Sequence, residues 1–364
     1  MDLSVIIPFH SDKASLDICL RTLLPTLPVE AEVIVVVNNT DEAAVSFNFD
    51  ENRLRILRFR ESLGYSRSIN IGAKAAKGRY LAFSDVDTSY TGGWLQAHLK
   101  LHRENLDVGI TSSKLIEPRL GRIADFGIGL TRYSHFHPFF DRPHDFPLTL
   151  MNRRVQMACS ASMLISRDLF LAVGGLDEEL VDFYQDVDLC LRLKDFKKQC
   201  WVVPDAIVFH KGKSAQSSRL TYQIDVRGLY FAKNFARMEV DIKDHLTEGI
   251  DWFFSRSRIE RDYVLVDLTT IADREFYYAI IKERFPIADV YRCPQLERDA
   301  PDICLLSIAG GNLTTLRAPL LFLVDRHTAL ARNALWSKLR QSSADVIVDR
   351  HANVASFNDL SCYV

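Results

Sequence analysis

The chain has 364 residues, of which 48% are hydrophobic and 25% are charged, so it can bury a large core and is not a disordered protein. Its formal net charge of −2 gives no electrostatic argument for a nucleic-acid partner. Seven cysteines are scattered without a CxxC pair, which fits reduced thiols in the cytoplasm better than a disulfide framework or a zinc site.

No apolar run of the sequence approaches the roughly 20 residues that a membrane-spanning helix requires. The amino-terminal segment has the pattern of a strand that ends in proline, and it lacks the basic region of a signal peptide. We therefore expect a cytoplasmic chain, and any association with the inner face of a membrane would be peripheral.

Strands and helices alternate over the first third of the chain. Short apolar or β-branched runs predict strands, and apolar residues at helical spacing predict the helices between them. The predicted strands cover residues 3–8, 32–37, 53–59, 80–84 and 108–112, and the predicted helices cover residues 13–24 and 66–76, the second one closed by Gly78. This rhythm predicts an α/β fold with a mostly parallel sheet and helices on both faces.

Residues 117–154 are rich in proline, glycine, histidine and aromatic residues, and they predict a long ordered loop over the sheet. Loops of this kind often carry function in compact domains. The loop carries four aromatic side chains, Tyr133, Phe136, Phe139 and Phe140, which would either face a ligand or pin the loop to the core. Beyond the loop we predict strands at residues 157–166 and 199–204 and helices at residues 167–173, 187–196 and 220–235.

The pattern of the chain changes near Arg256. Strand candidates and helical patterns continue to alternate, but no motif in this part indicates a role. The strand candidates are residues 263–268, 303–308, 320–324 and 346–348, and the helical patterns are residues 273–285 and 329–340. Residues 258–364 therefore predict a second, smaller α/β unit.

The segment from Arg79 to Asp87 carries the most specific chemical signal in the sequence. An apolar run with the pattern of a buried strand ends in two carboxylates, Asp85 and Asp87, separated by one residue. Side chains at i and i+2 of an extended chain point to the same side, so both carboxylates can face one ligand. Such oxygen ligands suit Mg²⁺ or Mn²⁺, although a lone pair of aspartates is also compatible with a solvated turn.

Several short motifs occur in one characteristic order. SVIIP at 4–8, VVVNNT at 35–40, LGY at 63–65 with NIG at 70–72, and GRYLAFSDVD at 78–87 resemble the nucleotide-sugar half of a family 2 glycosyltransferase. VGGLDE at 173–178, QDVDLCLR at 185–192, VPDA at 203–206 and His210 resemble the acceptor half of that family. The resemblance covers roughly residues 1–215 and leaves the carboxyl-terminal unit outside.

The resemblance implies a GT-A fold over residues 1–257, with a nucleotide-sugar half at residues 1–115 and an acceptor half at residues 116–257. Residues 258–364 would then be an accessory α/β domain of unknown role. The resemblance also implies a nucleoside diphosphate sugar as donor, Mn²⁺ or Mg²⁺ as cofactor, and inversion at the anomeric carbon.

By the family pattern Asp87 is the direct metal ligand, Asp85 lies nearer the ribose and assists, and His210 supplies a further ligand. Taken alone, a histidine at the end of a strand is also compatible with a structural role. Such a metal would neutralise charge on a departing nucleoside diphosphate.

Inverting transfer needs a carboxylate that takes the proton from the attacking hydroxyl. Asp186 occupies the position of this base in the family, and Asp188 is the alternative. An aspartate at the start of a helix also caps free backbone amides, and that role is compatible with catalysis. Gln185 stands where the family usually has glutamate, which changes the local field.

The family pattern places Pro8, Asn38, Asn70, Asp85 and Asp87 at the nucleotide sugar. Asn38 stands where the family commonly has an aspartate that accepts from the N3–H of uracil. Asparagine can accept through its carbonyl oxygen and can also donate. We therefore favour a UDP-sugar and keep dTDP-, GDP- and CMP-linked donors as alternatives.

The leading hypothesis is an inverting transferase that builds a bacterial surface polysaccharide on a glycan or lipid-linked acceptor, as a monomer or a homo-oligomer. A nucleotidyltransferase is disfavoured because the first strand is not followed by a glycine-rich, basic loop for a triphosphate. A degenerate glycan-binding or scaffold subunit stays open because of Gln185 and Asn38. The residues that argue against it are Asp85, Asp87, Asp186 and His210.

Overall fold

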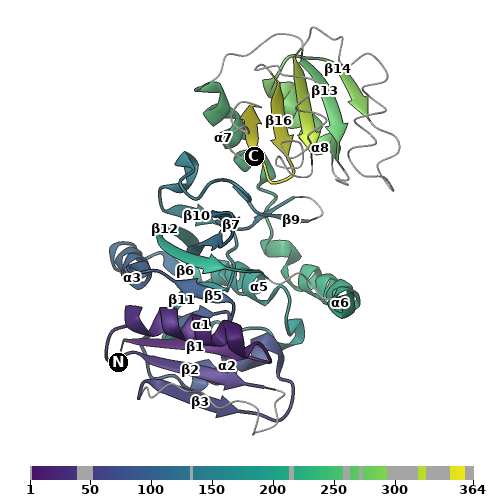
Figure 1. The fold of residues 1–364 in the computed structure, drawn as a ribbon. Coiled ribbons are helices and arrows are strands. Elements are labelled where there is room, and N and C mark those ends of the chain that lie inside the picture. Colours follow the sequence, from purple (N-terminus) through teal and green to yellow (C-terminus); the bar gives the residue numbers. More distant parts are fainter. Residues whose placement is uncertain are drawn as a thin grey trace. The chain divides into compact units, whose positions relative to one another are not determined.

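The computed structural model describes residues 2–38, 52–131, 134–212, 217–256, 263–269, 274–292, 319–324 and 345–356. Its contacts divide the chain into two compact units (Figure 1). The first unit contains Met1–Ile128 and Arg142–Glu239, and the second contains Gly129–Asp141 and Val240–Val364. The strand expected at residues 303–308, the helix expected at residues 329–340 and Tyr133 lie outside the described residues.

Within the described residues, the first unit is built on a ten-stranded sheet. Its strands run in the order β10-β12-β6-β11-β4-β1-β2-β3, while β5 pairs with β12 and β7 pairs with β6. The four strands from β4 to β3 are mutually parallel, and β11, β10, β5 and β7 join the sheet antiparallel. The strands are β1 (Leu3–Phe9), β2 (Glu32–Val37), β3 (Leu54–Arg58), β4 (Tyr80–Ser84), β5 (Thr88–Tyr90), β6 (Val108–Glu117), β7 (Arg122–Asp125), β10 (Arg153–Val155), β11 (Ser162–Ser166) and β12 (Gln199–His210).

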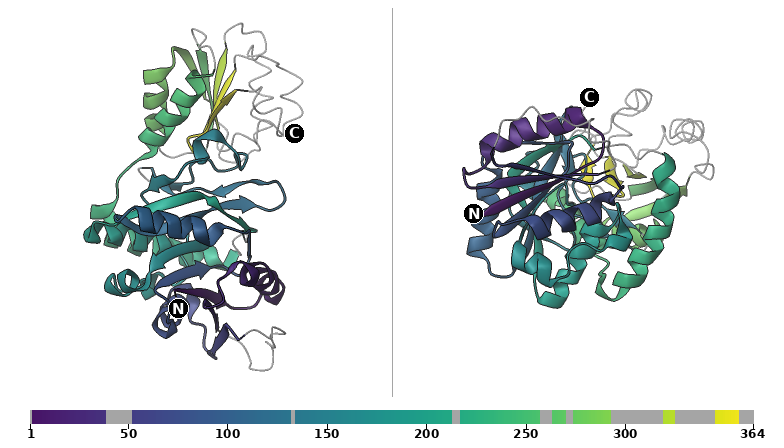
Figure 2. Two further views of the ribbon diagram at one scale, coloured as in Figure 1. Left: turned by 90° about the vertical axis from the view of Figure 1, so that its left-hand side faces the viewer. Right: turned by 90° about the horizontal axis from the view of Figure 1, so that it is seen from below.

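Helices cover both faces of the parallel strands, as the α/β prediction requires (Figure 2). On β1, Val5 and Ile7 share a core with α1 (Lys13–Leu23), while Ile6 faces α2 (Gly64–Ala75) on the other side. A Cβ atom at Gly72 of α2 would lie 2.5 Å from Ile6, so this close helix packing requires glycine. The remaining helices of the unit are α3 (Trp94–Glu104), α4 (Arg167–Ala172), α5 (Gln185–Arg192) and α6 (Ser217–Asn234), and short 3-10 turns lie at Leu24–Thr26, Pro147–Thr149, Glu178–Leu180, Leu193–Phe196 and Phe235–Arg237.

The structure corrects two sequence expectations in the first unit. Helix α2 ends at Ala75, and Gly78 does not cap it. Gly78 is glycine because a Cβ atom there would lie 2.5 Å from the backbone of Leu3 and Ser4. The segment expected as one long loop at residues 117–154 contains strands of both units, so it is not a single loop over one sheet.

The second unit holds a five-stranded sheet in its described part, in the order β14-β13-β15-β16-β17. Its first four strands are parallel and β17 is antiparallel to β16. The elements are β8 (Gly129–Leu130), β9 (His135–Phe136), α7 (Ile242–Phe254), β13 (Tyr263–Leu268), α8 (Arg274–Arg284), β14 (Ile287–Arg292), β15 (Leu320–Val324), β16 (Val346–Asp349) and β17 (Val354–Ser356).

Helix α7 belongs to the core of this second unit. Its buried residues Ile242, Leu246 and Ile250 pack in the same cluster as Leu265 of β13 and Phe136 of β9. The contacts therefore divide the chain between residues 239 and 240, ahead of the boundary expected at residues 257 and 258. Apolar spacing predicted the helix-and-strand alternation but could not tell which sheet α7 covers.

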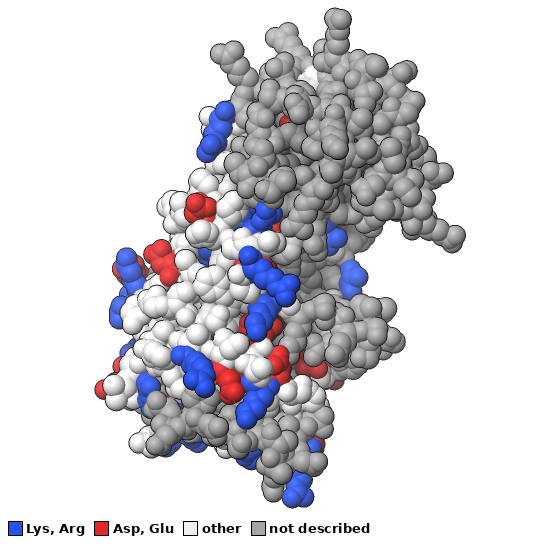
Figure 3. Space-filling view, viewed as in Figure 1, with Lys and Arg blue, Asp and Glu red and all other residues white. Residues whose placement is uncertain are grey.

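Acidic and basic side chains are both present over the described part of the face that Figure 3 shows, without a large field of one sign. In the part of the chain that the structure describes, none of the helices combines the length and the apolar character that crossing a membrane demands.

Candidate active site

A cleft of about 480 Å³ lies at the carboxyl ends of the parallel strands of the first unit, the edge at which open α/β sheets bind ligands. Pro8 and Phe9 reach it from β1, Asn38 from the end of β2, and the segment after β4 supplies the two aspartates. Further lining residues come from the turn before β11, the start of α5 and the end of β12.

The turn that carries the acidic pair is fixed on both sides. Thr88 donates from its hydroxyl to the carbonyl oxygen of Asp85 at 2.7 Å, which closes the turn after β4. The amide of Asp85 donates to the carbonyl of Ala161 at 3.0 Å, which ties the turn to the segment before β11. Asp85 and Asp87 are therefore held by backbone contacts that do not involve their carboxylates.

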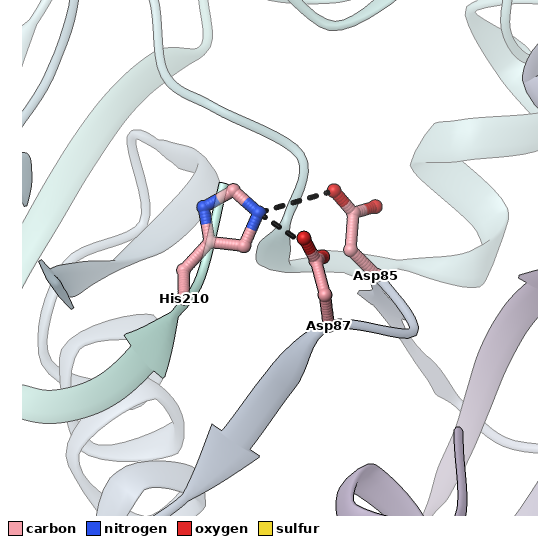
Figure 4. A group of neighbouring side chains, drawn as sticks. All are labelled: Asp85, Asp87 and His210. Carbon is pink, nitrogen blue, oxygen red and sulfur yellow. Dashed lines mark ion pairs between the residues drawn. The ribbon is translucent and has the colours of Figure 1, made fainter. Parts of the chain in front are cut away.

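Strand register brings His210 to the same place. Strand β5 pairs antiparallel with β12, so that His210 lies opposite Thr88, and the amide of Lys211 donates to the carbonyl of Asp87 at 3.1 Å. The imidazole Nε2 lies 3.2 Å from Asp87 Oδ1 and 3.7 Å from Asp85 Oδ2, as Figure 4 shows. The structure thus brings together all three residues that the sequence predicts as metal ligands.

The electrostatics of this cluster follow from its burial. Burial raises the pKa of Asp85 to about 6, against the opposing influence of His210. Burial lowers the pKa of His210, but its hydrogen bond to Asp87 and the two carboxylate charges outweigh this effect, and the net shift is upward.

The donor set of the cluster fits a divalent cation. One ligand atom from each residue lies within 4.8 Å of the others, and the side chains of Asp87 and His210 are 8% and 18% exposed. Two carboxylates and an imidazole form a mixed oxygen and nitrogen set, which suits Mn²⁺ better than Mg²⁺ with its preference for oxygen.

Asp186 lies at the first turn of α5 and lines the same cleft. Its Oδ1 accepts from the amide of Val187 at 2.9 Å, and its Oδ2 accepts from the amide of Ser160 at 3.1 Å. Burial raises the pKa of Asp186, while these backbone donors work in the opposite direction. A carboxylate with a raised pKa binds a proton more strongly, which suits a general base.

Asp188 is placed differently. It is 2% exposed, its Oδ2 pairs with Arg192 Nε at 2.8 Å, and its Oδ1 accepts from the side-chain amide of Asn234 at 2.7 Å. One oxygen thus pairs within α5 and the other holds α5 against α6. Asp188 is not among the residues that line the cleft in the described structure. Of the two aspartates, Asp186 is therefore the one that can reach a ligand in the cleft.

The residues expected at the nucleotide sugar divide into two groups. Pro8 and Asn38 line the cleft, whereas Asn70 does not belong to its described lining. The side chain of Asn70 donates to the carbonyl of Leu176 at 2.9 Å and accepts from the amide of the same residue at 2.8 Å. A Cβ atom on Gly175 would lie 2.5 Å from Asn70 Oδ1, so Asn70 and the glycine turn fit each other as a structural unit.

A second hollow of about 500 Å³ lies beside Asn70. Lys74, Gly174, Gly175 and Arg192 are among its lining residues. The guanidinium of Arg192 donates to the carbonyls of Val173 and Gly175 and to Asp188, so each of its three nitrogens makes a hydrogen bond within the protein. Asp85, Asp87 and His210 are not among the described residues that line this hollow.

Sequence reasoning missed the contacts that join the two halves of the cleft. Tyr65 donates from its hydroxyl to the carbonyl of Ser160 at 3.3 Å, and Asp182 accepts from the amide of Tyr65 at 2.8 Å. These residues and Cys159 line the cleft. The motif LGY at residues 63–65 was the only signal for Tyr65, since Ser160 lies 95 residues further along the chain.

The sheet, the flanking helices and the cleft at the strand ends define a GT-A glycosyltransferase fold. The crystal structure of GalNAc-T7 with UDP, GalNAc and Mn²⁺ has a TM-score of 0.51 to this chain, with 15% identity over 63% of this chain and 48% of that one. At this level of identity the likeness shows the fold.

Residues 4–170 match the family model described as Glycosyl transferase family 2. An uncharacterized protein, y4gI of Sinorhizobium fredii, is 30% identical over 52% of this chain and 22% of its own length. The O-antigen biosynthesis protein RfbC of Myxococcus xanthus is 30% identical over 52% of this chain and 16% of its own length. The chain thus spans a small part of these relatives, and its similarity to glycosyl transferase family 2 lies in residues 4–170.

Proposed function

We propose that the protein is an inverting, metal-dependent glycosyltransferase that moves a sugar from a nucleoside diphosphate sugar to a hydroxyl of a glycan or lipid-linked glycan. The observation that carries this proposal is the presence of the cluster of Asp85, Asp87 and His210 and the buried carboxylate of Asp186 in one cleft. Such a reaction requires charge neutralisation at the leaving group and a base at the attacking hydroxyl.

The roles of the residues follow from their positions. Asp87, His210 and Asp85 would hold Mn²⁺ or Mg²⁺, which when bound stabilises negative charge on the departing diphosphate. Asp186 takes the proton of the acceptor hydroxyl, and the amides of Ser160 and Val187 hold its carboxylate in place. Tyr65 fixes the distance between the two halves by its bond to Ser160.

The hydrogen bonds of Asn38 support a sugar donor whose nucleobase offers an N–H group. Its side-chain nitrogen donates to the carbonyl of Phe9 at 3.1 Å and to the hydroxyl of Ser68 at 3.3 Å. A carbonyl oxygen accepts only, so the amide must turn its nitrogen to Phe9 and leave Oδ1 as an acceptor. Uracil, thymine and guanine offer a ring N–H to such an acceptor and cytosine does not, so UDP-sugars stay favoured and CMP-sugars lose support.

A role in surface-polysaccharide synthesis is the biological setting that we propose. The relative from Myxococcus xanthus is named as an O-antigen biosynthesis protein, and another relative, of Mycobacterium tuberculosis, is named as a pre-mycofactocin glycosyltransferase with 26% identity over 57% of this chain. The second unit would act as an accessory domain that positions the acceptor, and its described residues contain no group of side chains that could hold a metal ion.

The test is nucleotide release from a panel of UDP-, dTDP-, GDP- and CMP-sugars with and without Mn²⁺. We expect release from a UDP-sugar that depends on the metal and disappears in Asp186→Asn. Thermal unfolding with UDP and Mn²⁺ gives an independent measurement, because a ligand that binds the native state raises its stability. Nucleotide binding without any release would favour the glycan-binding alternative, and the absence of both would refute the proposal.

A further inference from the structure

Gln185 is a residue of the cleft to which the proposed reaction assigns no role. It is the first residue of α5, directly precedes Asp186 and lines the cleft. It is 7% exposed, and its side-chain oxygen Oε1 is buried without a hydrogen-bond partner among the described residues. Buried side-chain polar atoms nearly always have a partner, so this one requires an explanation.

The surrounding backbone is held in place, so the protein has no simple way to supply that partner itself. Tyr184, directly before Gln185, has a left-handed backbone conformation with φ of 63°, and its ring stacks on Tyr230 at 4.9 Å between centroids. Asp188 and Arg192 fix the next turn of α5. The terminal torsion of a glutamine side chain is soft, however, so the amide can rotate toward the cleft at small cost.

The chemistry of a primary amide selects the kind of group that satisfies it. Gln185 can donate from its nitrogen and accept at its oxygen, so it pairs fully with a hydroxyl, which also donates and accepts. A phosphate oxygen without a proton accepts only and would leave Oε1 without a partner. The matching ligand is therefore the carbohydrate, and Asp186 must already lie against a hydroxyl if it is the base.

We propose that Gln185 is a specificity-determining residue that hydrogen-bonds a hydroxyl of the sugar bound beside Asp186. The inference rests on the proposed function, because it requires a carbohydrate in this cleft. The donor sugar and the acceptor sugar both offer such hydroxyls, and the experiment separates them.

The variant Gln185→Met has a similar length and no hydrogen-bonding group, so it should have two opposite effects. Without ligand, the midpoint of thermal unfolding should rise by about 2–4 °C, because an unsatisfied buried oxygen is removed. Recognition of the sugar should weaken by about tenfold, the equivalent of one hydrogen bond. A glutamine with a purely structural role would give a lower midpoint and unchanged sugar recognition.

Gln156→Met is the matched control. The side chain of Gln156 accepts from Lys194 and from the amide of Glu239 and donates to the carbonyl of Glu239. This variant removes satisfied hydrogen bonds in the same unit and away from the cleft. Its unfolding midpoint should fall, and its recognition of sugar should not change.

Two measurements identify the sugar. If Gln185 binds the donor, the wild type binds a UDP-sugar more tightly than UDP in the presence of Mn²⁺. Gln185→Met should then bind the UDP-sugar no more tightly than UDP, while its affinity for UDP is unchanged. If Gln185 binds the acceptor, donor affinity and UDP release into water are unchanged. In that case the variant loses the stimulation of UDP release by methyl glycosides of glucose, galactose, mannose or N-acetylglucosamine.

The proposal is overturned if Gln185→Met has a lower midpoint of thermal unfolding than the wild type, and if the two proteins have the same preference for a UDP-sugar over UDP and the same UDP release. That outcome leaves the proposed function intact, since the wild type still binds and turns over the donor. A wild-type protein that neither binds UDP with Mn²⁺ nor releases it from any UDP-sugar overturns both proposals.

Discussion

Asp186 and Asp188 lie two residues apart on α5, and we predict that substituting them separates catalysis from stability. Asp186→Asn keeps the size of the side chain but cannot take a proton from the acceptor. Transfer should therefore fall by roughly 10²–10⁴-fold, while the affinity for UDP with Mn²⁺ should be unchanged. The structure adds an expected cost in stability that the sequence alone did not indicate.

That cost can be worked out from the contacts of Asp186. Its two oxygens accept from the amides of Val187 and Ser160, whereas asparagine has only one oxygen. One amide would then face the NH₂ group, and an unsatisfied buried donor costs about 1–3 kcal/mol. Because burial already raises the pKa of Asp186 and disfavours its charge, the neutral side chain recovers part of this loss. We expect a net destabilisation of about 1 kcal/mol.

Asp188→Asn should show the opposite profile. The variant loses the ion pair with Arg192 but can still accept from Asn234. Arg192 is 20% exposed, so water offsets part of the loss, and we expect a destabilisation of about 1–3 kcal/mol. The rate of UDP release per folded molecule should stay within a few-fold of wild type. Initial rates and denaturant unfolding of both variants provide the test, and a large rate loss confined to Asp188→Asn would refute the assignment.

Three further substitutions test other parts of the first unit. Asp87→Ala should abolish turnover and Mn²⁺-dependent UDP binding while the protein stays folded, which calorimetry and circular dichroism can measure. The carboxylate of Glu32 accepts hydrogen bonds from Ser4, from Arg55 and from the amide of Lys77. Burial raises the pKa of Glu32, but these donors outweigh burial, and the net pKa lies below the ordinary value of 4.5. The charged Glu32 should therefore stabilise the folded protein above pH 4.5, and this contribution should be lost as the pH falls through the lower folded-state pKa. Glu32→Gln should remove this pH dependence and lower the free energy of unfolding by about 1–3 kcal/mol. Asn38→Asp restores the residue common in the family, yet it places a carboxylate against the carbonyl of Phe9, so the melting temperature and UDP affinity should both fall.

The acidic pair and its histidine could be predicted because the signal is local or tied to strand ends. Asp85 and Asp87 follow an apolar run that ends at the edge of the sheet, and the order of motifs indicated His210. What the sequence could not supply is the register of β5 against β12, which sets His210 beside Asp87 at 3.2 Å. The α/β fold was likewise predictable from the alternation of strands and helices, and it is confirmed.

Other parts of the site depend on partners that are distant in sequence. The sequence left Asp188 as the alternative to Asp186, and it could not show that Asn234, 46 residues away, binds Asp188. The family pattern places Asn70 at the nucleotide sugar, but its side chain binds the backbone of Leu176, which lies 106 residues away. No local pattern encodes such pairings, because they arise only when the two halves of the unit fold onto each other.

Removal of the second unit is the remaining prediction, and the structure changes where the chain should be cut. A fragment of residues 1–256 keeps α7 but lacks the strands that cover it, so the apolar side chains of Ile242, Leu246, Ile250 and Phe253 would be exposed. Burial of one such side chain contributes about 1.5–3 kcal/mol, so the loss is roughly 6–12 kcal/mol and the fragment should aggregate.

A fragment of residues 1–239 avoids this helix but still carries Phe136, which is 1% exposed in the intact chain and packs in the core of the second unit. We therefore expect the 1–239 fragment with Phe136→Ser to be more soluble than the 1–256 fragment, and to bind UDP with Mn²⁺ like the full chain. Acceptor transfer should be lost, since the second unit is proposed to position the acceptor. Size-exclusion chromatography and calorimetry measure the first two properties. A monomeric 1–256 fragment with full transfer would show that α7 needs no sheet and that the second unit is dispensable.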